Sequence, residues 1–514
     1  MNKPLIRRMV ASLAAAAMVA VGVSGIAMPA QAATKTLTIG YDSDPAPNGY
    51  DPVLYAAGQR LFYESLYDSL FFLDGKGGVT PGAAVSSSQP SDNLSINMVI
   101  RTGQKFSDGS ALTPDVVKAN LSRVFTDKKT DYPALQPFVA GGAAEIKSVT
   151  ADASSVTVTF AKAQAKAETL FTGASGMIVA GSQATINNKL GTAPVGSGPY
   201  TLVKAGTIKG NTYKLVKNAG YWNAAKYGYS NLVYKVYSNP QAQANAVATG
   251  QSDIAVNLNG STIALLQERQ TGLVTQGGNV FWLQFWNGGM NPPGPNPPVA
   301  DKNVRLALSY ATDRAALVKA LFKGNRPTAN WIPKGQTGFD ADLDSTYAYN
   351  PTKAKQLLAD AGARSLTVTT IAGSPAEIPF WTALAAQWAK VGVTLKFKLA
   401  ANTDELFGAV VSQPFGNFNT VNANPAGFAV GVILNGFANI FHTKNAAIEG
   451  ATYASLANPS ATNLKALNNA LVNEAWVMPY MEGYGYIGYN KFSIKQPTVG
   501  YDGLNPMLIS IQSK

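Results

Sequence analysis

The chain has 514 residues, far more than one hydrophobic core of ~100–200 residues usually serves, so two or three lobes are expected. Hydrophobic residues make up 46% and charged residues 14% of the sequence, which excludes a disordered chain. The absence of cysteine excludes disulfides, thiolate metal sites and cysteine nucleophiles, and the net charge of +12 comes from scattered lysines rather than a basic module, so we expect no nucleic-acid partner.

The first residues have the pattern of an export signal. A basic start is followed by an apolar run over residues 9–27, and an A-x-A cleavage pattern ends at Ala32. We therefore expect residues 1–32 to be a signal peptide and the mature chain to start at Ala33. The alternative is an uncleaved membrane anchor, because the apolar run is close to the length that spans a bilayer.

The next elements alternate strand and helix signals. Leu37, Ile39 and Tyr41 alternate with polar residues, which predicts a half-buried strand. The turn residues at 42–49 predict a loop, and the apolar stretch at 61–73 predicts a helix followed by a strand.

The sequence contains clear start signals for two helices. After a predicted strand at 94–100, Thr113 has the place of an N-cap and Pro114 that of the first helical residue. Asn350 and Pro351 repeat this start signal and predict a second helix. The glycine that follows its helical pattern is expected to end this second helix.

Alternation continues in two later blocks. The first predicts strands at 213–216 and 232–237 with a helix at 241–249. The second predicts, in order, a strand at 366–371, a helix at 378–391 and a strand at 393–399. This pattern is typical of α/β lobes with mixed sheets.

Five groups of motifs occur in a fixed order along the mature chain. The most distinctive pieces are Pro-Val-Gly-Ser-Gly-Pro-Tyr at 194–200 and the run that ends in Ser107-Asp108-Gly109. The groups are 63–70 with 74–76 and 81–84; 101–109 with 112–117; 194–200 with 217–223 and 241–254; 304–314; and 349–362. Together they resemble extracytoplasmic solute-binding protein family 5, the substrate-binding proteins of oligopeptide, dipeptide and nickel-type ABC importers.

The resemblance implies an α/β, two-lobed periplasmic-binding-protein (Venus-flytrap) fold with mixed sheets and an extra domain inserted in the first lobe. A ligand would bind between the lobes, which close about a hinge. The implied divisions are a signal peptide at 1–32; a discontinuous lobe I at 33–74, 191–285 and 479–514; an inserted domain II at 75–190; and a lobe III at 286–478.

The resemblance also implies a function without catalysis or cofactor. The expected partners are a small solute or peptide and the transmembrane subunits of an ABC permease, and we expect a monomer. Because no cysteine is present for lipid attachment, a periplasmic protein is favoured, or a secreted or cell-surface one if the host lacks an outer membrane. The alternatives are a sensor or peptide-chaperone receptor on the same scaffold and a secreted hydrolase.

The ligand site predicted in the far lobe is uncharged. Peptide-binding relatives hold the ligand ammonium with an aspartate there, but the corresponding stretch of this chain has only polar and aromatic candidates: Phe418, Asn419, Asn422 and Asn424. Because burying an ammonium without a counter-charge costs several kcal/mol, neutral polar ligands such as oligosaccharides fit better than free-amine peptides. An anion from Asp44 or Glu482 would reverse this preference.

Further candidates lie where the chain should cross between lobes. Trp286 and Asn287 follow an aromatic strand whose other rings are equally explained as core. Near the C-terminus, Tyr480, Glu482, Tyr484 and Tyr486 fall on one face of an extended run, of which Glu482 and Tyr484 are ligand candidates.

Two remaining candidates and one histidine complete the set. Ser43 and Asp44 lie in the loop after the first strand. Asp44 and Glu482 are also the only carboxylate pair that a hydrolase could use. The single histidine, His442, cannot form a metal site alone, so we expect no metal and place His442 at the surface.

Overall fold

The computed structural model describes residues 35–54, 57–74, 78–126, 144–181, 193–237, 239–258, 262–269, 271–290, 297–373, 377–401, 405, 408–409, 412–420, 425–500 and 506–514. The predicted signal peptide and its cleavage site lie outside these residues. Within them, no helix combines the length and the apolar character that crossing a bilayer requires.

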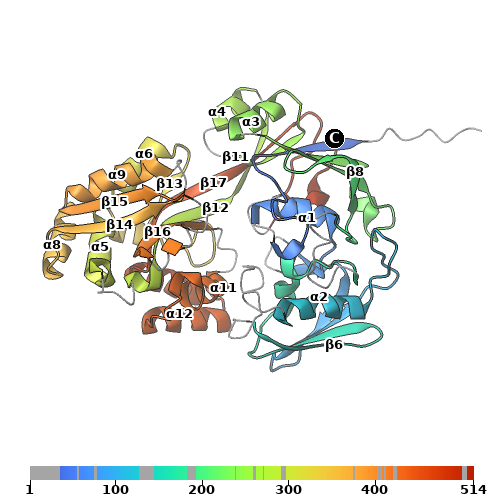
Figure 1. Ribbon diagram of the computed structural model, residues 1–514, viewed down its shortest axis with the longest axis horizontal. Coiled ribbons are helices and arrows are strands. Elements are labelled where there is room, and N and C mark those ends of the chain that lie inside the picture. Colours follow the sequence, from blue (N-terminus) through green and yellow to red (C-terminus); the bar gives the residue numbers. More distant parts are fainter. Residues whose placement is uncertain are drawn as a thin grey trace, which may run out of the picture. The chain divides into compact units, whose positions relative to one another are not determined.

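The largest sheet is mixed and has nine strands (Figure 1). Eight follow the order β16-β12-β17-β11-β1-β10-β9-β8, and β13 pairs with β17. The strand β1 runs parallel to β10 and β11, whereas the other pairs are antiparallel. The bounds are β1 Thr36–Tyr41, β8 Tyr200–Ile208, β9 Thr212–Lys217, β10 Asn231–Val236, β11 Ile254–Leu258, β12 Gly272–Phe285, β13 Arg326–Pro327, β16 Phe415–Thr420 and β17 Val477–Tyr489.

Three smaller sheets accompany it. The strands β4 (Ala84–Ser88), β5 (Ser95–Ile100), β7 (Ser155–Phe160) and β6 (Ile146–Ala151) form an antiparallel sheet in that order. The hairpin of β2 (Phe71–Leu73) and β3 (Val79–Pro81) is separate. The parallel pair β14 (Leu366–Ala372) and β15 (Val393–Leu399) is joined through a helix, as the alternation at 366–399 predicts.

The helices begin where the sequence signals them. Thr113 Oγ1 accepts a hydrogen bond from Val116 N and Asn350 Oδ1 accepts one from Lys353 N, so both predicted N-caps are confirmed. The bounds are α1 Arg60–Leu66, α2 Pro114–Thr126, α3 Pro240–Ala248, α4 Ile263–Glu268, α5 Lys302–Tyr310, α6 Arg314–Leu321, α7 Ala341–Thr346, α8 Pro351–Asp360, α9 Ile378–Ala389, α11 Pro425–Phe428, α12 Ala446–Ala457 and α13 Ala461–Asn473.

Three large hydrophobic clusters form the interior. One is built from residues between 53 and 180, a second from β1, β9, β10 and neighbouring segments, and a third from residues between 280 and 481. The long strands β12 and β17 lie side by side and take part in two of them. Ile487 of β17 belongs to the second cluster, whereas Trp282 of β12 and Tyr480 of β17 belong to the third. The division into lobes at the residue numbers given above stays a prediction.

Gly196, in the most distinctive motif, is required by a close backbone approach. A Cβ at this position would lie 2.0 Å from the carbonyl oxygen of Leu66, which a backbone atom cannot avoid by changing rotamer. Gly196→Ala is therefore expected to lower the free energy of unfolding by roughly 3 kcal/mol. Gly450→Ala is the control, because a Cβ in this α12 glycine meets open space and should stabilise the protein by about 0.5–1 kcal/mol. Urea unfolding of both variants tests this, and equal stabilities would contradict it.

Asp68 ties the β2–β3 region to two other segments. Its fully buried carboxylate accepts hydrogen bonds from Gln104 Nε2 (2.6 Å), Tyr221 OH (3.0 Å) and Trp222 Nε1 (2.9 Å). Burial raises the pKa of Asp68 to about 6, although these hydrogen bonds and the charge of Arg101 oppose the rise. Between pH ~4 and ~6, Asp68 is therefore still protonated in the folded protein, whereas in the unfolded chain it has already lost its proton.

Asp68 should consequently make the protein less stable as the pH rises through this interval. The loss attributable to Asp68 is expected to be up to ~3 kcal/mol between pH 4 and pH 7. Asp68→Asn removes the titrating group at nearly constant shape, so its unfolding free energy should fall less over the same interval. Urea denaturation of both proteins at pH 4.5 and pH 7.5 measures the difference, and parallel pH profiles would refute this role.

Candidate functional site

An aromatic cluster lies where β12 and β16 pair. It consists of Trp282, Trp286, Trp331, Phe418 and Phe428. The ring centroids of Trp282 and Phe418 are 5.1 Å apart, and those of Trp286 and Phe418 are 6.3 Å apart with perpendicular planes. The cluster exists because Trp282 of β12 stands opposite Phe418 of β16 in the antiparallel register. Two predicted site residues, Trp286 and Phe418, are thus brought into contact.

Gly416 makes room for Trp286. A Cβ at Gly416 would lie 3.0 Å from the Trp286 ring, and the Trp286 amide donates to the carbonyl of Pro414. Trp286 retains 6% of its surface exposed, so the indole is fixed by the protein before any ligand arrives. Such rigidity lowers the entropy cost of binding.

The turn after Trp286 has an unusual backbone. Asn287, Gly288 and Gly289 all have positive φ angles, a conformation that favours glycine and, among other residues, asparagine. The Asn287 carboxamide is fully buried and accepts a hydrogen bond from the amide of Phe441 at 3.1 Å. The predicted contact of Asn287 with a ligand stays a prediction, whereas its contact with Phe441 is established.

Two apolar side chains that the sequence did not single out lie in the segment whose backbone Asn287 binds. Ile440 and Phe441 are both exposed, with 37% of Phe441 accessible. They stand beside Ala438, which packs on Trp286. Their only sequence signal is an apolar pair in a polar stretch.

The asparagines predicted in the far lobe are only partly described. Asn417 lies on β16, and its Oδ1 accepts a hydrogen bond from Tyr480 OH at 3.0 Å. Asn419 is also on β16 and pairs with Phe281 of β12. The side chain of Asn419 is not described. Asn422 and Asn424 lie outside the described residues.

The predicted face of β17 is altered by a bulge. The pairs Phe281 with Met481 and Trp282 with Pro479 leave Tyr480 as an extra residue in β17. Such an insertion reverses the alternation on one side of it. Tyr480 accordingly stacks on Phe380 on the side of Phe281, and the prediction that it shares a face with Glu482 is wrong.

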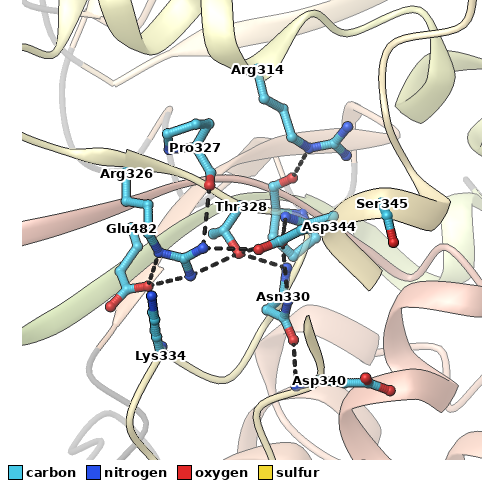
Figure 2. A network of polar contacts seen from close by, with 12 residues as sticks. Arg314, Arg326, Pro327, Thr328, Asn330, Lys334, Asp340, Asp344, Ser345 and Glu482 are labelled. Carbon is cyan, nitrogen blue, oxygen red and sulfur yellow. Dashed lines mark hydrogen bonds and ion pairs between the residues drawn. The ribbon is translucent and has the colours of Figure 1, made fainter. Parts of the chain in front are cut away.

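Glu482 belongs to a charged network that is centred on Arg326 and joins β17, β13 and α7 (Figure 2). Its side chain is fully buried, and its Oε2 lies 2.6 Å from Arg326 Nη2. Oε2 also accepts from Arg326 Nε and from the Lys334 amide. Arg326 contacts Asp344 at 2.8 Å with its Nη1. Glu482 therefore has its counter-charge within the protein.

The electrostatics of this network keep Arg326 and Asp344 ionised. Burial lowers the pKa of the Arg326 guanidinium, but hydrogen bonds and charges from Glu482 and Asp344 outweigh it and raise the pKa. Burial raises the pKa of Asp344, but donors from Ala329, Arg326 and neighbouring groups outweigh it and lower the pKa. Burial, with a contribution from Glu482, raises the pKa of the half-buried Tyr484.

Ser43 and Asp44 lie in a different environment. Asp44 Oδ1 accepts hydrogen bonds from Tyr213 OH at 2.6 Å and from the Ala46 amide at 2.8 Å. Ser43 is exposed and donates to Asp42. None of the contacts described for Ser43 and Asp44 reaches Glu482 or the aromatic cluster. The hydrolase alternative thus gains no carboxylate pair from the described contacts.

Metal ligands are likewise not gathered in the described part of the chain. No group of three or more His, Asp and Glu side chains there could hold a metal ion. His442 is exposed, as expected, and has a positive φ angle.

Comparison with known proteins gives a consistent result. The family model described as "Bacterial extracellular solute-binding proteins, family 5 Middle" matches residues 78–437. A dipeptide-binding protein of Escherichia coli (strain K12) is 27% identical over 419 residues, which cover 75% of this chain and 76% of that protein. The glutathione-binding protein GsiB of Salmonella choleraesuis is 27% identical over 301 residues, covering 58% of this chain and 56% of GsiB.

Solved structures share the fold. AgaA from A. tumefacien R10, in complex with agropinic acid, has a TM-score of 0.78 at 21% identity, covering 93% of this chain and 98% of AgaA. A dipeptide-binding protein from Pseudoalteromonas sp. SM9913, in complex with Met-Leu, has a TM-score of 0.75 at 16% identity, covering 93% of this chain and 100% of that one. These likenesses confirm the predicted periplasmic-binding-protein fold.

Proposed function

The chain belongs to family 5 of the bacterial extracellular solute-binding proteins, and on that premise we propose that it captures a solute outside the cytoplasm and delivers it to the permease of an ABC importer. The match of the family model over residues 78–437 carries this conclusion. The named relatives, which bind dipeptides and glutathione, support it. The proposal includes cleavage after residue 32, a periplasmic location, a monomeric receptor without catalysis, and closure of the lobes defined from the sequence.

We place the ligand against Trp286 and Phe418, with Asn419, Asn422 and Asn424 as further contacts. The surroundings of Trp286 that the structure describes are apolar: Phe418, Val432 and Ala438. An aromatic surface with nearby carboxamides suits a polar molecule that has an apolar face.

The ligand is proposed to be uncharged at the end that enters this site. Of the nominated carboxylates, Glu482 has its counter-charge in Arg326. Asp44 accepts hydrogen bonds from the neutral Tyr213 hydroxyl and the Ala46 amide, and none of its described contacts reaches the aromatic cluster. The Glu482 carboxylate is fully buried, and its Oε2 is already held by Arg326 and by the Lys334 amide, so a ligand ammonium would have to compete with a positive charge that is in place. A neutral sugar-like or blocked-amine compound avoids that competition.

A thermal-shift panel tests the ligand class. Oligosaccharides, sugar conjugates and other uncharged solutes should raise the unfolding temperature more than free-amine dipeptides at equal concentration. A solute at 100 times its Kd stabilises the folded state by about 2.7 kcal/mol, which is readily detected. A response confined to free-amine dipeptides would overturn the proposed ligand class while leaving the receptor function standing.

A further inference from the structure

A cavity of about 300 Å³ lies outside the candidate site. Its walls come from α1, the β2–β3 hairpin, the loop at 221–227 and the C-terminal segment at 506–509. None of the lining residues belongs to the aromatic cluster or to the network of Glu482. Its volume is at the lower end of the range for small-molecule sites.

Apolar side chains make up most of the wall. Phe72 and Pro81 contribute from the hairpin, and Met507, Leu508 and Ile509 contribute from the C-terminal segment. These groups offer dispersion contacts and no hydrogen bonds.

The aromatic part of the wall is apolar for a specific reason. Tyr221 and Trp222 both turn their polar atoms toward Asp68, at 3.0 Å and 2.9 Å. What they present to the cavity is therefore ring carbon. Arg101 lies over the Trp222 ring at 3.8 Å and donates to the carbonyl of Gly82, so the indole is held in place although 37% of it is exposed.

The charged groups of the described wall already have polar partners within the protein. Arg60 and Glu64 form an ion pair with each other one helical turn apart. Asp74 accepts a hydrogen bond from the Gly78 amide at 2.9 Å. A charged ligand would have to compete with these partners, whereas an uncharged aromatic ring would not.

We propose that this cavity is a second binding site, for a small uncharged aromatic compound that packs against Trp222 and the C-terminal segment. The site is independent of the solute site at Trp286. The volume of about 300 Å³ limits the ligand to one or two fused rings.

Indole serves as the probe, and saturation-transfer NMR with calorimetry measures its binding to the full chain. Saturable binding with a Kd below ~1 mM is expected from an apolar ligand of this size. Thr80→Trp places a large ring at the cavity from an exposed strand position and should weaken indole at least tenfold. Thr150→Trp is the matched control, because Thr150 is an exposed strand threonine of β6 that does not line the cavity.

Three outcomes decide the proposal. Loss of indole binding in Thr80→Trp alone supports it, provided that both variants unfold at the wild-type temperature. Equal binding by all three proteins places indole elsewhere and overturns it, as does the absence of saturable binding to the wild type. Transported solutes, once known, should bind all three proteins equally, which separates this site from the solute site.

Discussion

Arg305→Met is expected to lower the free energy of unfolding by ~3–5 kcal/mol, since it removes a buried charged donor from a set of backbone acceptors. Arg305 is 4% exposed, and its guanidinium donates to the carbonyls of Ala475, Gly288, Val299, Ala300 and Glu474. Burial lowers the pKa of Arg305 to about 10, so the side chain is still charged at neutral pH. Methionine fills part of the volume but satisfies none of these oxygens.

A neighbouring lysine provides the control for Arg305. Lys302 is in the same helix and forms an exposed ion pair with the Glu474 side chain at 2.7 Å. Lys302→Met should change stability by less than ~1 kcal/mol, as exposed pairs usually do. Urea is used as the denaturant, because the salt guanidinium chloride would screen the ion pair between Lys302 and Glu474. Similar losses in the two variants would show that the carbonyls around Arg305 find other donors.

Arg305 also holds the backbone next to the proposed solute site. One of its bonds, at 3.0 Å, holds the carbonyl of Gly288, directly after Trp286 and Asn287. The Arg305 variant should therefore bind solute more weakly even at temperatures where it is fully folded.

Trp286→Ala is expected to reduce solute affinity at least ~30-fold, corresponding to the loss of about 2 kcal/mol that is typical of a tryptophan anchor. The indole follows the end of β12 and is packed against the Phe418 ring. Because the side chain is almost buried, the same change should cost ~3–5 kcal/mol of stability. Calorimetric titration at a temperature where circular dichroism shows the variant folded separates the two effects.

An exposed ring serves as the comparison for Trp286. Phe492 is 74% exposed, so Phe492→Ala should leave both solute affinity and stability within experimental error of the wild type. If Trp286→Ala binds the solute as tightly as Phe492→Ala does, the ligand does not lie against the aromatic cluster.

Local structure was largely predictable from the sequence. The caps at Thr113 and Asn350 and the alternation at 366–399 each depend on residues close together in the chain, and the structure confirms them. Proline fixes φ and short polar side chains satisfy free amides, so these signals act before tertiary packing.

The site was less predictable because its contacts join distant residues. Glu482 and Arg326 are 156 positions apart, and no local sequence pattern predicts that they form an ion pair. The bulge at Tyr480 breaks the two-residue period on which the predicted face depended. Trp286 and Phe418 were each nominated, but their contact follows from the register of β12 with β16. Asn287 was nominated for its place in the chain, while its burial depends on the fold around Phe441.

Native mass spectrometry of the protein purified without unfolding tests most directly whether this chain is a solute receptor. We expect a non-covalent adduct of defined mass that disappears on denaturation, and the same compound, added back, should raise the unfolding temperature by mass action. Protein that carries no adduct, and whose unfolding temperature no solute in the panel changes, would contradict it.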